Sequence, residues 1–174
     1  PRWNGLSPLG RQAVELLNRL GIMVDISHVS DKTFYDVLAA TRAPVIASHS
    51  SCRALCAVPR DMNDDMVRAL ARNGGVIDIN FYSGFLSPAF AEGYKKIEKQ
   101  VDTEIAAARA HYAQQGKRLP YLEEVKLQQR LIKDLPVPSY TVIADHIDHA
   151  VRIAGIDHVG LGYYFDSIDS TPRD

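Results

Sequence analysis

The sequence lacks several features that would place it in a common class of protein. Its 174 residues include only two cysteines, Cys52 and Cys56, and a disulfide framework needs more than one such pair. No apolar run approaches the roughly 20 residues that cross a bilayer, and no secretory signal opens the chain. The formal net charge is only -1, which gives no electrostatic attraction to nucleic acid or an anionic membrane. We therefore expect free thiols, no membrane span and no nucleic-acid partner. These features do not indicate a cellular compartment.

The composition is that of a globular protein with one core. Hydrophobic residues make up 46% of the chain and charged residues 24%, close to the averages for folded domains. The chain starts at Pro1 and stops soon after an apolar run. We expect residues 1–174 to be part of a longer polypeptide and to belong to a single domain.

Short apolar runs alternate with helical patterns along most of the chain. Strands are predicted at 22–27, 43–48, 75–81 and 158–162, because short apolar runs are typical of buried parallel strands. Ser7, Ser30 and Asn63 are predicted N-caps of helices that follow, and another helix is expected to start near Ser139. In the first helix, apolar residues are expected to share one face: Leu9, Ala13, Leu16, Leu17 and Leu20.

The alternation stops between residues 83 and 138. Two helical patterns occur there, separated by Gly116 and Pro120, which predicts a helical insertion rather than a separate domain. Four strand–helix units amount to half of a (β/α)8 barrel or most of a small doubly wound sheet. In either architecture, residues at the carboxyl ends of the strands carry function.

Two histidines stand where the first two predicted strands end. His28 follows the strand at 22–27, and His49 follows the strand at 43–48. Neutral imidazole is a common metal ligand, and neighbouring strand ends can place two of them on one ion. Adjacent serines could orient the rings. A pair of hydrogen-bonded histidines without a metal explains the pattern about equally well.

Other polar residues are weaker candidates. Arg60 could hold a carboxylate, although a solvated loop arginine explains it as well. Asp78 and Asn80 are expected to be buried polar residues near a strand end. His146 and His149, which with Asp145 could approach a metal, are more simply explained as part of a solvated helix face.

Several motifs in the same order resemble the membrane (renal) dipeptidase family of zinc peptidases. The matching segments are "GIMVDISHVSDKTF", "APVIASHSSCRALC", "PRDMNDD", "GGVIDINFY" and "ADHIDHAVRIAGIDHVGLG". The resemblance implies a (β/α)8 barrel of the metal-dependent hydrolase type with two zinc ions. It also implies that this chain is the C-terminal half, roughly strands five to eight plus the insertion at about 83–138.

The resemblance also implies roles for individual residues. His28 and His49 match two histidines that bind zinc, and Arg60 matches the arginine that recognises the substrate carboxylate. Tyr82 falls near the substrate. The metals would polarise the scissile carbonyl and activate a water.

Two departures from the family pattern bear on activity. The family's His-x-Asp pair, its bridging Glu and a further substrate-contacting His belong ahead of Pro1. At the last strand, where the family has Gly-Ser-Asp-Phe-Asp-Gly, this chain reads "GYYFDS". Tyr164 therefore replaces the first Asp, and a phenol cannot substitute for a carboxylate at neutral pH. Asp166 matches only the second Asp and could replace the missing acid only if the loop is re-threaded.

The leading hypothesis is a fragment of a zinc-dependent dipeptidase that is inactive alone. Its expected partners are a dipeptide substrate and the missing N-terminal half of the barrel, with a homodimer as a further possibility because a half-barrel exposes two strand edges. One alternative is a non-catalytic family member that acts in binding or assembly. Another is an active parent altered at Tyr163 and Tyr164.

Overall fold

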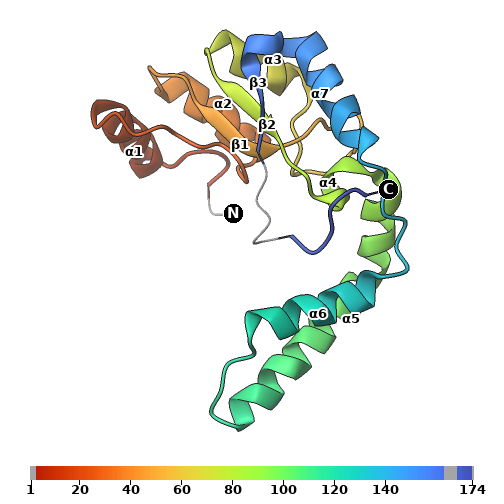
Figure 1. The fold of residues 1–174 in the computed structure, drawn as a ribbon. Coiled ribbons are helices and arrows are strands. Elements are labelled where there is room, and N and C mark those ends of the chain that lie inside the picture. The colour runs from red at the N-terminus through yellow and green to blue at the C-terminus, as the bar shows by residue number, and fades with distance from the viewer. Residues whose placement is uncertain (1–2, 163–167, 174) are drawn as a thin grey trace.

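Three parallel strands form the sheet at the centre of the protein. The computed structural model describes residues 3–162 and 168–173 (Figure 1). The strands are β1 (Ile46–Ser50), β2 (Val76–Ile79) and β3 (Val159–Leu161), in the order β1-β2-β3. The fold is therefore mixed α/β with a small parallel sheet, as the alternating pattern predicts.

Helices separate the strands and extend beyond them. They are α1 (Pro8–Arg19), α2 (Asp31–Ala40), α3 (Asp64–Arg72), α4 (Ser83–Leu86), α5 (Pro88–Gln114), α6 (Tyr121–Ile132) and α7 (Thr141–Ala154), with a 3₁₀ turn η1 (Ile156–His158) before β3. The three predicted N-caps are confirmed. Ser7, Ser30 and Asn63 each accept a hydrogen bond from the backbone N–H three residues later, which satisfies a donor that the helix leaves unpaired.

The prediction of a strand at 22–27 is wrong, because this segment forms no regular strand. This segment pairs with β1 through one isolated parallel bridge, between Asp25 and Ile46. Directly after it the chain turns, because the Asp25 carboxylate accepts the Ser27 N–H at 2.9 Å and His28 has a φ of 70°. A side chain that bonds to its own backbone two residues on favours a turn over a continued ladder.

The two faces of the sheet have different roles. Ala47, Ile77 and Ile79 are fully buried on the face that α3 and α7 cover, together with the rest of the core. Val76 and Asp78 alternate with these residues and point to the opposite, partly exposed face. Polar groups on that second face can therefore reach a ligand without crossing the core.

The predicted helical segment at 83–138 contains a pair of long helices. In Figure 1, α5 and α6 lie side by side and project away from the sheet. An ion pair joins them, with Arg109 Nη2 at 2.7 Å from Glu124 Oε1. Among the described residues, no helix combines the length and apolar character needed to cross a bilayer.

The predicted first helix is confirmed as α1, and its apolar residues are only partly buried. Val14 is 5% exposed, but Leu9, Leu16 and Leu20 are 73%, 47% and 62% exposed. The physical reason is position, since α1 lies at one end of the described structure and packs mainly against α2 (Figure 1).

Candidate functional site

The two predicted ligand histidines meet at the carboxyl-end rim of the sheet. The Nε2 atoms of His28 and His49 are 2.8 Å apart, and their ring centroids are 4.9 Å apart. They belong to segments 21 residues apart in sequence. The structure thus brings together the residues that the strand-end pattern singled out.

Local backbone features aim both rings at this point. The register between β1 and β2 shifts between Ala47 and Ser50, so β1 carries an extra residue at Ser48–His49, as in a β-bulge. Bulges re-aim side chains beside functional sites. His28 reaches the same place because its left-handed backbone, with a φ of 70°, turns the chain at the end of the preceding segment.

A chain of polar contacts orients the His49 ring. Ser48 Oγ lies 2.7 Å from His49 Nδ1 and 2.5 Å from Asp25 Oδ2. Because the ionised carboxylate only accepts, the Ser48 hydroxyl donates to Asp25 and accepts the proton of Nδ1. This arrangement fixes the tautomer in which His49 Nε2 carries a lone pair. Sequence reasoning noted the serine but missed Asp25, whose role depends on pairing between distant segments.

Burial and a neighbouring positive charge favour the neutral form of both histidines. Burial and then the Arg60 guanidinium lower the pKa of His28 and of His49. Burial alone would raise the pKa of Asp25, but hydrogen bonds from the Ser48 hydroxyl and the Ser27 and Ser48 amides lower it overall. The site therefore contains two neutral imidazoles beside an ionised carboxylate, which is the protonation state that metal binding requires.

The geometry fits shared coordination of one metal ion after a small adjustment. Two nitrogens bound tetrahedrally to zinc at about 2.0–2.1 Å would be roughly 3.3 Å apart. The Nε2 atoms of His28 and His49 are 2.8 Å apart. Small ring rotations that move these atoms by a fraction of an ångström would bring them to the separation that zinc requires. Within the described ranges, no group of three or more His, Cys, Asp or Glu side chains forms a complete metal site.

Arg60 lies against the backbone of the same rim. Its Nη2 donates to the His49 carbonyl at 2.8 Å and its Nη1 to Ser50 Oγ at 3.3 Å. The guanidinium carbon is 5.4 Å from the centroid of the Phe85 ring, a cation–π distance. The arginine is therefore held in place next to the histidine pair, where a carboxylate ligand could reach both.

Asp61, the residue after Arg60, is a buried carboxyl that sequence reasoning did not single out. This residue is 1% exposed, and among the described residues no group meets ordinary hydrogen-bond geometry with either carboxyl oxygen, although the nearby Ser51 amide partly offsets the effect of burial on its pKa. Burial raises the pKa of Asp61 to about 8, despite the opposing charges of Arg60 and Arg53. A substantial fraction of this carboxyl is therefore protonated at neutral pH.

Tyr82 contacts both the end of β2 and the last part of the chain. Tyr82 precedes α4, and its N–H donates to the Asn80 side chain at 2.9 Å. Its own side chain forms a hydrogen bond that moderates the burial-raised pKa of Asp169. Asp169 was missed from sequence, whereas the predicted Asp166 lies outside the described residues, as does Tyr164.

His146 contradicts the prediction of a solvated helix face. It is 1% exposed, and its Nδ1 accepts the Cys52 N–H at 3.0 Å while Nε2 donates to the Leu86 carbonyl at 3.2 Å. The neighbouring His149 donates to Asp64 at 2.8 Å. These histidines are structural links, and the predicted free thiols, Cys52 and Cys56, are confirmed and buried.

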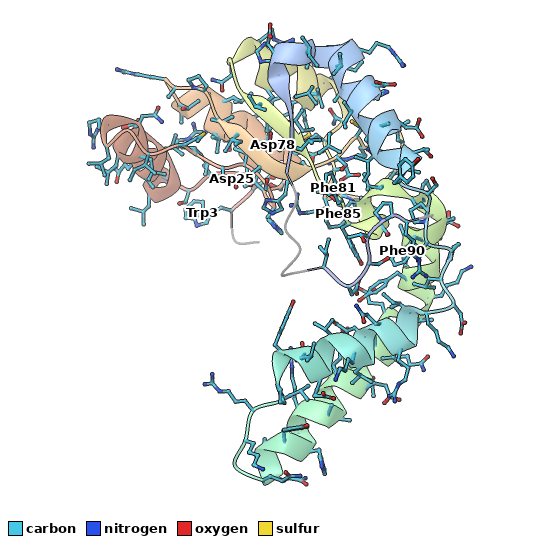
Figure 2. The ribbon with its side chains drawn as sticks, in the orientation of Figure 1. Trp3, Asp25, Asp78, Phe81, Phe85 and Phe90 are labelled. Carbon is cyan, nitrogen blue, oxygen red and sulfur yellow. The ribbon has the colours of Figure 1, made fainter. Side chains whose placement is uncertain are left out.

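Asp25 and Asp78 lie on the same side of the sheet (Figure 2). Burial and then the Asp25 charge raise the pKa of Asp78. Gly160 on β3 pairs with Asp78, and a Cβ at this glycine would lie 2.1 Å from Asp78 Oδ1. The glycine thus leaves room for the carboxylate. The expected buried amide, Asn80, is confirmed at 0% exposure and donates to Ser51 Oγ at 2.9 Å.

Two solved structures with a similar fold are described as those of peptidases. A probable dipeptidase, PvdM, from Pseudomonas aeruginosa matches with 31% identity and a TM-score of 0.66 over 91% of this chain and 42% of its own. A metallo peptidase from Rhodobacter sphaeroides, liganded with a phosphinate mimic of the dipeptide L-Ala-D-Ala, matches with 26% identity and a TM-score of 0.67 over 98% of this chain and 36% of its own.

The sequence comparisons agree with the structural ones. An uncharacterized dipeptidase of Schizosaccharomyces pombe is 34% identical over 97% of this chain and 30% of its own length. An uncharacterized protein in the pqqA 5' region of Klebsiella pneumoniae is 30% identical over 94% of this chain and 45% of its own. This chain therefore spans less than half the length of these relatives.

The fold resembles that of metallopeptidases. The family model for membrane dipeptidase (peptidase family M19) matches residues 1–174, and the chain belongs to this family.

Proposed function

We propose that this chain is the C-terminal part of a zinc-dependent dipeptidase. In this proposal, the segment 22–27 and strands β1, β2 and β3, with their helices, correspond to roughly strands five to eight of a single (β/α)8 barrel domain. Helices α5 and α6 are an insertion in that domain. The rest of the barrel, ahead of Pro1, supplies the remaining ligands of a two-zinc site. The isolated chain has little or no activity.

The convergence of His28 and His49 carries the proposal. Their Nε2 atoms lie 2.8 Å apart on the side of the sheet where parallel α/β folds place their active sites. The lowered pKa values of both rings and the Asp25–Ser48 contacts to His49 favour metal binding. Supporting contacts of this kind fix the tautomer and angle of ligand histidines.

Each residue has a defined role in the reaction. Zinc bound by His28 and His49 would supply a Lewis acid for the scissile carbonyl and would acidify water. Arg60 binds the free carboxylate of the dipeptide and sets its distance from the metal. Tyr82 lines the substrate site beside it, and its hydrogen bond to Asp169 holds the ring in position. Asp166 remains a candidate for an acid near the substrate amine.

The test is a polypeptide in which the upstream coding sequence precedes Pro1. We expect it to contain zinc and to hydrolyse dipeptides, and His28→Ala and His49→Ala to remove both properties. Arg60→Met should raise KM for dipeptides with a free carboxylate much more than for dipeptide amides. Zinc-dependent turnover that survives both histidine substitutions would refute the proposal. For the isolated chain, robust turnover lost on His49→Ala would refute its predicted inactivity.

A second candidate function is non-catalytic binding or assembly. The observation in its favour is Tyr164 at the position of the family's acid. If the extended polypeptide contains zinc but lacks turnover, and Tyr163→Ser with Tyr164→Asp restores turnover, the chain derives from an enzyme that has lost one acid. Absence of the upstream metal ligands would favour the binding protein.

A further inference from the structure

Asp61 is a buried acid that directly follows Arg60 in the loop between β1 and α3. The residue is 1% exposed, and no group in the described part of the chain meets ordinary hydrogen-bond geometry with either of its carboxyl oxygens. A charge that is buried without such partners is costly, so the protonated, neutral form of this acid is favoured. The reaction described above gives the carboxyl no role.

The loop fixes the position of Asp61 relative to Arg60. Arg53 Nε donates to the Asp61 carbonyl at 2.8 Å. The next residue, Met62, donates its N–H to the Ser51 carbonyl at 2.9 Å. The backbone around the acid is therefore bonded to the start of the loop, and the carboxyl cannot leave its buried position unless these bonds break.

Arg60 and Asp61 lie against successive residues at the end of β1. Arg60 Nη1 donates to Ser50 Oγ at 3.3 Å, and the Ser51 amide acts on the Asp61 carboxyl, where it partly offsets the effect of burial on the pKa. Ser50 and Ser51 are 2% and 0% exposed. Because water is excluded from this segment, a charge on Asp61 would act on the guanidinium more strongly than it would in solvent.

The acid changes its charge in mild alkali. Burial raises the pKa of Asp61 to about 8, although the charges of Arg60 and Arg53 oppose this effect. Arg53 is also paired with the Asp31 carboxylate at 2.7 and 2.8 Å. At neutral pH a large fraction of Asp61 therefore carries no charge that could offset the charge of Arg60.

The ionisable groups around Asp61 come from the loop and from two helices. Burial raises the pKa of the Cys52 and Cys56 thiols to about 12. On α7, burial lowers the pKa of His146, which accepts the Cys52 N–H. These three groups therefore stay neutral from pH 7 to about pH 9.5. On α3, the charge of Asp64 acts on Cys52. The remaining charged neighbours are Arg53 and Arg60.

We propose that Asp61 is a positioning residue that acts through Arg60: its neutral carboxyl leaves the guanidinium charge to the substrate carboxylate, and its ionisation weakens substrate binding. The inference rests on the proposed function for the role of Arg60. An ionised Asp61 offsets positive charge at the guanidinium and competes with the substrate carboxylate for it. At the effective dielectric constant of a protein, one such charge weakens carboxylate binding by roughly three- to tenfold.

The experiment measures binding without catalysis. The extended polypeptide, with a chelator present, is titrated by calorimetry with N-propanoyl-alanine, which is the dipeptide Ala-Ala without its amino group, and with N-propanoyl-alaninamide. Neither probe changes its charge between pH 7 and about pH 9.5. We expect the acid to bind more tightly than the amide at pH 7. This preference, the ratio of the two dissociation constants, should fall roughly three- to tenfold at the alkaline end.

Substitutions of Asp61 separate its charge from its place in the fold. Asp61→Asn and Asp61→Leu, which have similar volumes and no charge, should keep the full preference at both pH values. Asp65→Asn, at an exposed carboxylate, is the matched control and should lose preference in alkali as the native chain does. Circular dichroism at each pH and an unchanged affinity for the amide verify that the fold is intact.

The outcomes distinguish this inference from the proposed function. A preference that stays constant with pH in the native chain, or that falls equally in Asp61→Asn and Asp61→Leu, would overturn the role of Asp61. Zinc-dependent dipeptide hydrolysis with such a constant preference would leave the proposed function standing. No preference for the acid at pH 7 would refute the role of Arg60 and this inference with it. A preference that is lost in alkali only when Asp61 is present, without any hydrolysis, would support the inference and refute the catalytic proposal.

Discussion

The Arg53 guanidinium forms a two-point ion pair with the Asp31 carboxylate: Nη1 lies 2.7 Å from Oδ2, and Nη2 lies 2.8 Å from Oδ1. The same side chain donates from Nε to the Asp61 carbonyl at 2.8 Å and from Nη2 to the Pro59 carbonyl at 3.2 Å. Arg53 thus ties the loop on both sides of Arg60 to the start of α2. The backbone on both sides of the proposed carboxylate-binding arginine is therefore held in place.

Loss of this support should weaken both the fold and substrate recognition. Arg53→Met removes four hydrogen bonds, two of them to a partly exposed carboxylate, and we expect the free energy of unfolding to fall by about 1–2 kcal/mol. Urea denaturation measures this change, and KM in the extended polypeptide should rise. Arg68→Met breaks an exposed pair with Asp65 and should have almost no effect; equal effects of the two substitutions would contradict the prediction.

Zinc affinity should depend on a residue that does not touch the metal. Ser48→Ala breaks the link between the Asp25 carboxylate and His49 Nδ1, so the tautomer of His49 is no longer fixed. We expect zinc affinity of the extended polypeptide to fall roughly 10- to 100-fold, measured by competition with a chromophoric chelator. Thr103→Ala, on the exposed part of α5, serves as the control. An unchanged affinity in Ser48→Ala would show that the serine has no orienting role.

Stability should fall in mild acid because of His146. Burial lowers the pKa of this histidine below its ordinary value of 6.5, so the unfolded chain binds the proton more readily than the folded one. The contribution of neutral His146 is therefore complete above pH 6.5 and is lost as the pH falls below this value. Unfolding free energies of the native chain and His146→Gln, measured across this range, should differ most at the high end and converge in acid.

Asp61 should give the opposite pH dependence. Its pKa is raised from 3.8 to about 8, so the folded state binds a proton that the unfolded chain has lost. Stability from this group is complete below 3.8 and is lost as the pH rises towards 8. Asp61→Asn should flatten this decline in denaturation experiments, and Asp65→Asn, at an exposed carboxylate, should not. Parallel pH profiles for Asp61→Asn and the native chain would refute the assignment.

The isolated chain should associate or be marginally stable. Leu9, Leu16 and Leu20 are exposed at α1, and within the described residues no further strand pairs with the outer edge of β3. We expect sedimentation velocity to show dimers or larger species that Leu16→Lys with Leu20→Lys reduces. Tyr121→Lys, at an exposed residue of the hairpin, is the control. A compact monomer with a cooperative melt would contradict this expectation.

Sequence patterns predict the local elements of this protein well. Caps and apolar runs have causes within a few residues, so α2, α3 and β2 occur where the sequence indicates them. The strand predicted at 22–27 does not form because the Asp25 side chain accepts a hydrogen bond from the Ser27 N–H. The apolar pattern of a sequence does not indicate such a bond. The pattern correctly predicts helix α1, but it does not show whether a neighbouring element covers the leucines of that helix.

Only part of the candidate site can be predicted from the sequence. His28 and His49 stand at the ends of neighbouring apolar segments, where topology alone indicates convergence, whereas the role proposed for Arg60 came from the family resemblance. Asp25, Arg53 and Asp61 were not predicted because their significance comes from contacts or burial that only the folded chain creates. Nothing in their immediate sequence distinguishes them from solvated charges.

The irregular register of β1 has a consequence for how this protein tolerates length changes. A deletion of either Ser48 or His49 would restore even pairing with β2 and would leave most backbone hydrogen bonds of the sheet intact. Ala47 and Ser50 would keep their buried face, because each already pairs with a buried residue of β2, and the bulge that re-aims the side chains at Ser48–His49 would be lost. We expect such a variant to be well folded but unable to bind metal. The extra residue in β1 would then be needed for the site and not for the fold.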